Sequence, residues 1–198
     1  MNIHNYSESC TRNQQVIAEQ LAPIFAQSNS VLEIGSGSGQ HALHFCQTHP
    51  HLNWQCSDQT QWLDGLTKNI AASEISTIAT PIELDVNARW PNKQYSLIYT
   101  ANSLHIMRMR SMQALFSNIG SHLTETGYFC CYGPFKYQGD YTSPSNRQFD
   151  VWLKNRDTLS GIRDFEVISE LAKEQRLKLI SDTNMPANNQ LLIWQKQS

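Results

Sequence analysis

A glycine-rich loop is the part of this sequence whose residue types and spacing point most directly to chemistry. Residues 33–39 read Glu-Ile-Gly-Ser-Gly-Ser-Gly; they follow the apolar pair Val31-Leu32 and precede a predicted helix that begins at Gln40. A strand, a glycine loop and a helix in this order are typical of a cradle for a nucleotide-type cofactor, because glycine permits tight turns and close approach of a ligand to the backbone. The alternative is an ordinary glycine-rich turn between a strand and a helix.

The spacing of the glycines favours one class of cofactor. The dinucleotide fingerprint G-x-G-x-x-G requires glycine at position 40, where this chain has Gln40, so a pyrophosphate site is disfavoured. The remaining pattern, acidic-x-Gly-x-Gly-x-Gly, resembles the first motif of class I methyltransferases, whose loop passes under the amino-acid end of S-adenosyl-L-methionine (SAM). This resemblance implies that SAM, and the product S-adenosyl-L-homocysteine (SAH), contact Glu33, Gly35, Ser36, Gly37, Gly39 and His41.

Strands alternate with helices along the chain, which is typical of a mostly parallel sheet covered on both faces. The predicted strands cover 31–35, 53–58, a segment ending at 85, 95–101, 127–132, 177–182 and 190–195, and the predicted helices cover 16–25, 40–49, 59–73, 110–123 and 165–175. Pro23 is expected to kink or end the first helix. The last two strands are joined by a short polar turn and should pair antiparallel, because a parallel pair needs a long crossover.

These elements predict an α/β fold of the Rossmann-like class I methyltransferase type. We expect a seven-stranded, mostly parallel sheet with an antiparallel C-terminal hairpin, helices on both faces, and one domain over residues 1–198. Ligands of open α/β sheets bind outside the carboxyl ends of the strands. Asp58 is therefore expected to accept the ribose hydroxyls, unless it is only a helix cap. The other cofactor candidates at strand ends are Gln59, Asp85, Val86 and Asn102.

Several stretches beyond the glycine loop carry a more specific resemblance. They are Trp54-Gln55-Cys56-Ser57-Asp58, Leu84-Asp85-Val86, Ala101-Asn102-Ser103-Leu104-His105-Ile106, Tyr132-Gly133-Pro134-Phe135, Thr142-Ser143-Pro144-Ser145-Asn146, Gly161-Ile162-Arg163-Asp164 and Met185-Pro186-Ala187-Asn188-Asn189. Together they resemble a methyltransferase-like family without a settled reaction that includes the animal methyltransferase-like protein twenty-six. The chain departs from that family at Met107-Arg108-Met109, which replaces a Ser-Pro-Trp-like segment and leaves the substrate open.

Two residues are candidates for catalysis. Methyl transfer from a sulfonium is an in-line displacement, so positioning can supply about 7–11 kcal/mol of the barrier lowering, and a base matters only for some acceptors. His105, just past the fourth predicted strand, has a side chain suited to act as that base or to hydrogen-bond beneath the cofactor. Asp150 is the second candidate. His41 and His44 lie three residues apart without a third ligand in register, so no metal site is expected.

Residues 133–164 are the predicted substrate lid. Ser143 can cap a helix that begins at Pro144, and this helix places Asn146 and Asp150 on one face, towards either the ligand or solvent. Arg163 is expected to bind an anionic substrate group or to cap the next helix. Arg12 is expected either to fold over the methionine carboxylate or to be an ordinary solvated arginine. The remaining substrate-binding candidates are Tyr132 and Asn188.

Composition and charge limit the kinds of partner that this protein is expected to bind. The net charge of -2 and the sequence pI near 6.4 disfavour nucleic acid, and no apolar stretch reaches the length of a membrane span. The N-terminal residues show no targeting pattern and the five cysteines no metal spacing, so a cytoplasmic protein with reduced thiols is expected. The oligomeric state is not predicted. We expect a SAM-dependent methyltransferase acting on a small molecule; the alternatives are a SAM/SAH sensor or scaffold without activity, and a protein methyltransferase.

Overall fold

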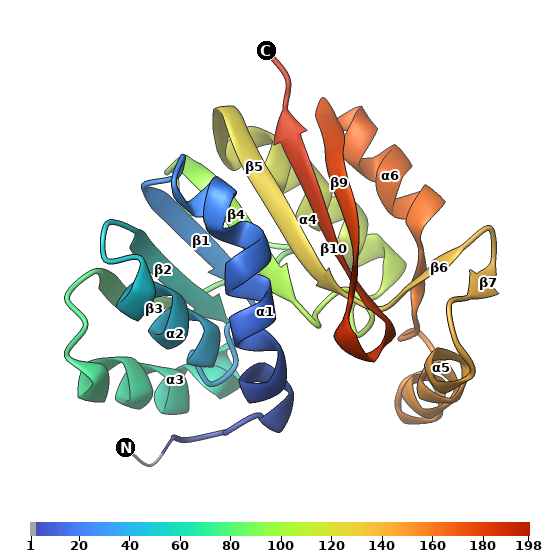
Figure 1. Ribbon diagram of the computed structural model, residues 1–198, viewed down its shortest axis with the longest axis horizontal. Coiled ribbons are helices and arrows are strands. Elements are labelled where there is room, and N and C mark those ends of the chain that lie inside the picture. Colours follow the sequence, from blue (N-terminus) through green and yellow to red (C-terminus); the bar gives the residue numbers. More distant parts are fainter. Residues whose placement is uncertain (1–2) are drawn as a thin grey trace.

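The central feature of the fold is a seven-stranded sheet, seen in a computed structural model that describes residues 3–198 (Figure 1). The strand order is β3-β2-β1-β4-β5-β10-β9. The strands are β1 (Ser30–Ile34), β2 (Asn53–Asp58), β3 (Ile78–Glu83), β4 (Tyr95–Ala101), β5 (Leu123–Gly133), β9 (Leu177–Met185) and β10 (Asn189–Lys196). The first five strands of this order, from β3 across to β5, pair in parallel. By contrast, β10 pairs antiparallel with both β5 and β9. The predicted class I methyltransferase sheet with its C-terminal hairpin is confirmed.

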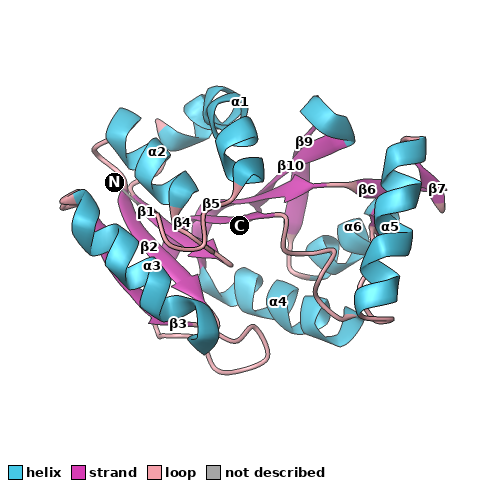
Figure 2. Cartoon of the chain, turned by 90° about the horizontal axis from the view of Figure 1, so that it is seen from below, coloured by secondary structure: helices cyan, strands magenta, loops and turns pink. Residues whose placement is uncertain are grey.

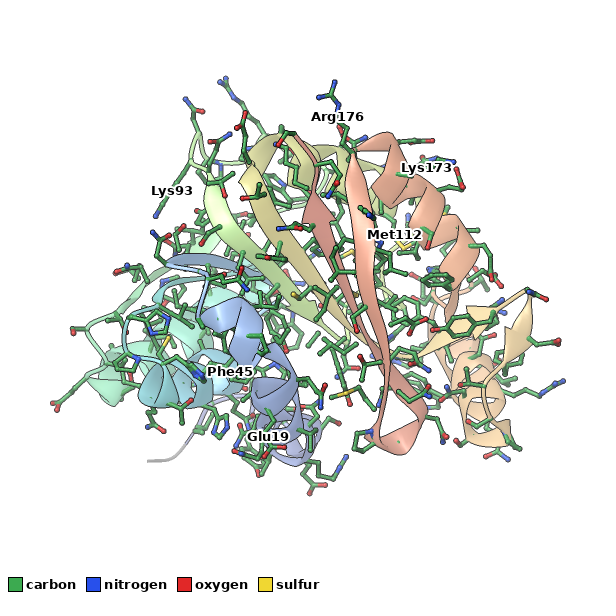
Figure 3. The ribbon with its side chains drawn as sticks, turned by 45° about the horizontal axis from the view of Figure 1, so that its top comes forward. Glu19, Phe45, Lys93, Met112, Lys173 and Arg176 are labelled. Carbon is green, nitrogen blue, oxygen red and sulfur yellow. The ribbon has the colours of Figure 1, made fainter. Side chains whose placement is uncertain are left out.

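Helices cover both faces of this sheet (Figure 2). One face carries α1 (Glu8–Phe25), α2 (Gln40–Thr48) and α3 (Thr60–Ser73), and the other carries α4 (Met109–His122) and α6 (Phe165–Glu174). Neighbouring residues of β5 serve opposite faces: Cys130 packs under the first group of helices and Cys131 under the second. Such alternation is the reason that a strand covered on both sides is apolar throughout. Each face of the sheet therefore packs its own cluster of buried apolar side chains against the helices. Figure 3 labels one side chain from each cluster, Phe45 of α2 and Met112 of α4.

The first helix differs from its predicted bounds. It begins at Glu8, where Ser7 acts as the N-cap and its Oγ accepts a hydrogen bond from the backbone N–H of Cys10 at 3.4 Å. It continues past Pro23 to Phe25, so Pro23 does not end the helix where it stands. The residues before Val16 were not predicted as helical because their apolar periodicity is weak. This extension brings the start of α1 to the edge of the sheet where the parallel strands end.

Residues 133–164 form a small unit of their own beside that edge. A three-stranded sheet of order β7-β6-β8 comprises β6 (Phe135–Tyr137), β7 (Asp140–Tyr141) and β8 (Arg163–Asp164), and α5 (Pro144–Arg156) lies between β7 and β8 in the chain. Ser143 caps α5 as predicted, since its Oγ accepts from the N–H of Asn146 at 3.1 Å. The small sheet was not predicted, because two- and three-residue strands carry no hydrophobic period. Figure 1 shows α5 next to the turn between β9 and β10.

That turn contains a short 3-10 helix, η1 (Pro186–Asn188). Because β9 runs parallel to β5, the turn lies at the carboxyl edge of the sheet. All five cysteines are free. Arg176 lies just before β9 and projects from the opposite edge (Figure 3). None of the helices formed by residues 3–198 has both the length and the apolar character needed to cross a membrane.

Candidate functional site

A cavity of about 1080 Å³ opens at the carboxyl ends of the parallel strands. It lies where the strand order reverses, between β1 and β4, which is the place where open α/β sheets bind ligands. The loops after β1, β2, β4 and β5 line it together with the start of α1, the start of α5 and the turn between β9 and β10. Segments far apart in the sequence therefore meet around one space, at the lower edge of the sheet in Figure 1.

The glycine loop forms one wall of the cavity. A Cβ on Gly35 would lie 2.6 Å from the Oγ of Ser103, so close packing against the loop after β4 requires glycine there. Gly37 has a φ of +56° and no atom within 4 Å of the position a Cβ would take, so its open side faces the cavity. Gly39 does not line the cavity; its open side is occupied by Leu66 and Ile70 of α3. Gly39 therefore supports the loop by packing against α3, and its predicted contact with the cofactor stays a prediction.

Asp58, at the end of β2, holds the glycine loop in place. Its Oδ2 accepts from the N–H of Gly37 at 2.7 Å, and its Oδ1 accepts from the N–H of Gln59 at 2.8 Å. Burial raises the pKa of Asp58, although these two hydrogen bonds oppose the shift. A carboxylate has about four acceptor positions, so both oxygens can accept further donors from the cavity.

Gln59 turns away from the cavity, contrary to its predicted role. Its side-chain oxygen accepts from Nε2 of Gln61 at 2.8 Å, and Gln59 is absent from the lining. Trp62, one turn into α3, lines the cavity and is 43% exposed. Trp62 was not among the predicted site residues, although an aromatic residue four positions after Asp58, the acid that ends the second strand, is a usable signal. Asn5, also missed, lines the cavity from the N-terminal segment.

Asp85 and Val86 also lie outside the cavity lining, so their predicted contact with the adenine is not supported. The Oδ1 of Asp85 accepts from the backbone N–H of Asn87 at 2.9 Å and from its Nδ2 at 2.8 Å, which forms a local turn. Val86 is buried in the core with α4, and its carbonyl accepts from Nδ2 of Asn118 at 3.2 Å. Local turn chemistry and core packing account for both residues.

Behind the glycine loop lies a buried polar network that contains Glu33 and His41. The Oε2 of Glu33 accepts from Nε1 of Trp54 at 3.0 Å, and burial raises the pKa of Glu33 to about 7. The ring of His41 bonds Asn13 Oδ1 at 2.8 Å and the hydroxyl of Tyr99 at 3.2 Å, and burial lowers the pKa of His41 to about 3. His41 and Asn13 line the cavity, whereas Glu33 lies behind it. Glu33 thus positions the loop from the interior.

The loop after β4 contributes Asn102, Ser103, His105 and Ile106 to the cavity. Asn102 adopts a φ of +56°, a left-handed conformation that asparagine tolerates, and this conformation turns the chain sharply at the end of the strand. His105 is 7% exposed and its ring meets the ring of Phe149 edge-on, with the centroids 5.2 Å apart. Burial, with the nearby charge of Arg163, lowers the pKa of His105 to about 4. No hydrogen bond within the described chain engages either ring nitrogen, so His105 presents a neutral, unpartnered imidazole.

Asn146 and Asn188 join the lid helix to the β9–β10 turn across the cavity. Nδ2 of Asn146 donates to the carbonyl of Asn188 at 2.9 Å and to the hydroxyl of Thr142 at 2.8 Å, and Nδ2 of Asn188 donates to the hydroxyl of Ser145 at 3.1 Å. Both asparagines line the cavity, as their predicted role requires. Their side-chain carbonyl oxygens are the polar atoms not used in these contacts.

Asp150 does not line the cavity, so its predicted catalytic role gains no support from the structure. Its Oδ2 accepts from the hydroxyl of Tyr141 and from Nζ of Lys154, both at 2.6 Å, and its Oδ1 accepts from the N–H of Ile162 at 2.6 Å. Burial alone would raise the pKa of Asp150, but these donors hold it below its usual value. The carboxylate fastens α5 to the segments on either side of it.

Arg163 is likewise absent from the cavity lining, so its predicted role in substrate binding gains no support from the structure. Its donors reach the carbonyls of Leu104, Met107 and Leu159, which holds the loop after β4 against the segment before β8. Burial lowers its pKa. The guanidinium of Arg163 therefore bonds two carbonyls that are distant in sequence, those of Leu104 and Met107, and one nearby carbonyl, that of Leu159.

Tyr132 and Arg12, by contrast, both line the cavity. Tyr132 is buried at the end of β5, and this burial raises its pKa. The Arg12 side chain is 68% exposed and pairs with Glu8 at 3.2 Å.

Among residues 3–198 no group of three or more His, Cys, Asp or Glu side chains could hold a metal ion. His44, for example, bonds Gln15 Oε1 at 3.2 Å.

Solved structures with the same architecture include several methyltransferases. An O-methyltransferase family protein from Burkholderia thailandensis has a TM-score of 0.84 and 15% identity over 96% of this chain and 58% of its own. A putative O-methyltransferase from Nostoc punctiforme gives 0.80 and 16%, over 94% and 56%, and human N-acetylserotonin methyltransferase in complex with SAM gives 0.81 and 13%, over 96% and 53%. At these identities the similarity establishes the class I methyltransferase fold, and this chain spans only 53–58% of the length of these three structures.

A sequence-family match covers nearly the whole chain. The profile of the family described as "Protein of unknown function (DUF938)" matches residues 4–196. The match includes the glycine loop, the loop after β4, the 133–164 unit and the turn between β9 and β10. The chain therefore belongs to the DUF938 family.

Proposed function

We propose that this protein is a SAM-dependent methyltransferase that acts on a small-molecule acceptor. The observation that carries this proposal is one cavity, at the switch point of the sheet, that joins the glycine loop and Asp58 to the unpartnered imidazole of His105. The structural likeness to methyltransferases supports it, including one solved with SAM. The resemblance to the family of the animal methyltransferase-like protein twenty-six agrees with it, and we propose that kinship as well.

The residues around the glycine loop fit the proposed cofactor. The open side of Gly37 leaves room for a ligand against the backbone, and Asp58 retains acceptor positions for the ribose hydroxyls. We assign the adenine end to the wall formed by Trp62 and Asn5, and the methionine end to the wall near Asn13 and Asn102. When bound, SAM supplies an activated methyl group on a sulfonium.

We further propose that residues 133–164 act as the substrate lid. Pro134, Ser145, Asn146 and Phe149 of this segment line the cavity, and the contact between Asn146 and Asn188 closes it on the side of the β9–β10 turn. The chain's contribution to transfer is then to hold the acceptor in line and to exclude water. An acceptor that carries a proton requires a nearby base, and His105 is the candidate within the cavity.

Binding of SAH tests the cofactor assignment. We expect SAH to bind by calorimetry and to raise the melting temperature, and we expect Gly37→Val to reduce its affinity at least about tenfold. Gly139→Val is the matched control, since Gly139 also has a positive φ and open space around its Cβ position but does not line the cavity. Equal loss in both variants, or none in Gly37→Val, would refute the glycine-loop assignment.

Transfer is tested with SAM labelled in its methyl group. Incubation with a cell metabolite extract should give labelled small molecules, whereas incubation with extract protein should not. Label found in protein would favour the alternative of a protein methyltransferase. SAH binding without label in either fraction would favour the alternative of a sensor or scaffold.

A further inference from the structure

We infer that the acceptor is an uncharged ring compound with a hydroxyl group, held in an aromatic slot formed by His105, Ile106 and Phe149. This inference rests on the proposed function and specifies the substrate class of the same cavity. The three side chains belong to the loop after β4 and to the lid helix, and all three line the cavity. Asp58 ends β2, whereas His105 and Ile106 follow β4, and β1 lies between these two strands in the sheet.

The side chains that form the slot favour a flat, apolar partner. The rings of His105 and Phe149 meet edge-on at an interplanar angle of 75°, and Phe149 stacks on Trp152 with the centroids 5.7 Å apart. Ile106 lines the cavity and is 56% exposed, so its apolar side chain is available to a bound molecule. Aromatic pairs and apolar burial together stabilise a bound ring. An aromatic acceptor would bury the apolar surfaces of Ile106 and Phe149.

The distribution of charge in the cavity disfavours a cationic acceptor at the aromatic slot. Among the described residues, the lining contains one carboxyl group, Asp58, and one guanidinium group, Arg12. Asp58 lies at the glycine loop, where it bonds the backbone, and Asp150 is occupied by Tyr141 and Lys154 outside the cavity. None of the three side chains of the slot is a carboxylate, so an ammonium group against them would have no charged partner among them. The protein therefore selects against amines that are protonated at neutral pH.

The unpartnered ring of His105 identifies the hydroxyl as the reacting group. In the proposed step the acceptor oxygen forms a bond to the methyl carbon while the bond from that carbon to sulfur breaks, and the electron pair of that bond stays on sulfur. The hydroxyl proton passes to a ring nitrogen of His105. Burial keeps this imidazole neutral at pH 7, and a weak base is sufficient because the proton of an oxygen undergoing alkylation is strongly acidic.

Three naphthalenes that differ in one substituent test the substrate class: 2-naphthol, 2-naphthylmethylamine and 2-naphthoate. Calorimetry on protein saturated with SAH should give an affinity for 2-naphthol at least about tenfold above either charged analogue. Phe149→Ala should weaken 2-naphthol binding at least about tenfold with SAH affinity unchanged. Val151→Ala is the matched control, because Val151 lies on the same helix, is 54% exposed and does not line the cavity.

The outcomes separate this inference from the proposed function. Failure of SAH to bind would refute the proposed function. With SAH bound, tighter binding of the amine or the carboxylate, or no binding of any naphthalene, would overturn the aromatic slot. Equal losses in Phe149→Ala and Val151→Ala would do the same.

The role of His105 is tested separately with the labelled cofactor and 2-naphthol. His105→Gln should lower the rate of methyl transfer about 100-fold or more, as expected for loss of a general base, while 2-naphthol and SAH affinities change little. A merely structural histidine would instead give a lower melting temperature and weaker SAH binding with a proportionate loss of rate. Unchanged transfer in this variant would remove the proton step from the inference.

Discussion

Asp150→Asn is the substitution that most sharply distinguishes a structural carboxylate from a catalytic one. Asp150 is 1% exposed, and its two oxygens accept three hydrogen bonds, from Tyr141, Lys154 and Ile162. Asparagine keeps an acceptor for the Ile162 N–H but places its amide donors against the other two donors. A hydrogen bond to a charged group contributes roughly 1.5–3 kcal/mol, so we expect the free energy of unfolding to fall by about 2–4 kcal/mol.

The exposed pair of Asp64 and Lys68 provides the matched control. It has the same residue types and the same i,i+4 spacing as Asp150 and Lys154, with an oxygen–nitrogen distance of 2.7 Å, but the Asp64 side chain is 81% exposed. Asp64→Asn should therefore change stability by no more than about 0.5 kcal/mol. Denaturant unfolding measures both variants, and in a domain of this size the expected loss for Asp150→Asn corresponds to a melting temperature lower by roughly 4–16 °C.

The pH dependence gives a second check on Asp150. Because its pKa is lower in the folded protein than in the unfolded chain, its contribution is complete above the unfolded pKa of about 3.9 and is lost as the pH falls through the folded pKa. Asp150→Asn should remove that part of the acid destabilisation. Unaltered stability with abolished transfer would refute the reasoning and restore a catalytic role for Asp150.

Two further perturbations follow from the contacts around the cavity. Burial raises the pKa of Glu33 to about 7, so the wild type should lose about 3 kcal/mol of stability as the pH rises from about 4.5 through 7. Glu33→Gln should remove this dependence of stability on pH. Denaturant unfolding at pH 5 and pH 8 measures it, and an equal change of stability in both proteins would contradict the assignment. Asn146→Ala removes the donor to the Asn188 carbonyl, so the free energy of unfolding should fall by about 1–2 kcal/mol. Calorimetry should show weaker 2-naphthol binding with SAH affinity unchanged. A lower SAH affinity would instead place Asn146 with the cofactor.

The sequence alone determined the sheet and the edge at which the site lies. The period of apolar residues and the short turn near Asn188 define the strands and the antiparallel hairpin. The strand before Gly35 and the helix after Gly39 place the loop at a strand end, and the parallel order places Asp58 and Asn102 at the same edge. These features depend on residues close together in the chain, or on a topological rule that holds for all open α/β sheets.

Only the tertiary structure decided which polar side chains face the cavity. Asn146 and Asp150 are one turn apart on α5, yet Asn146 reaches the carbonyl of Asn188 while Asp150 is held by Ile162. In the same way Trp62 lines the cavity and Gln59 does not. The direction of each side chain is set by donors and acceptors that the fold brings from distant segments. A buried polar group must find such partners, and local sequence does not reveal which partners will be within reach.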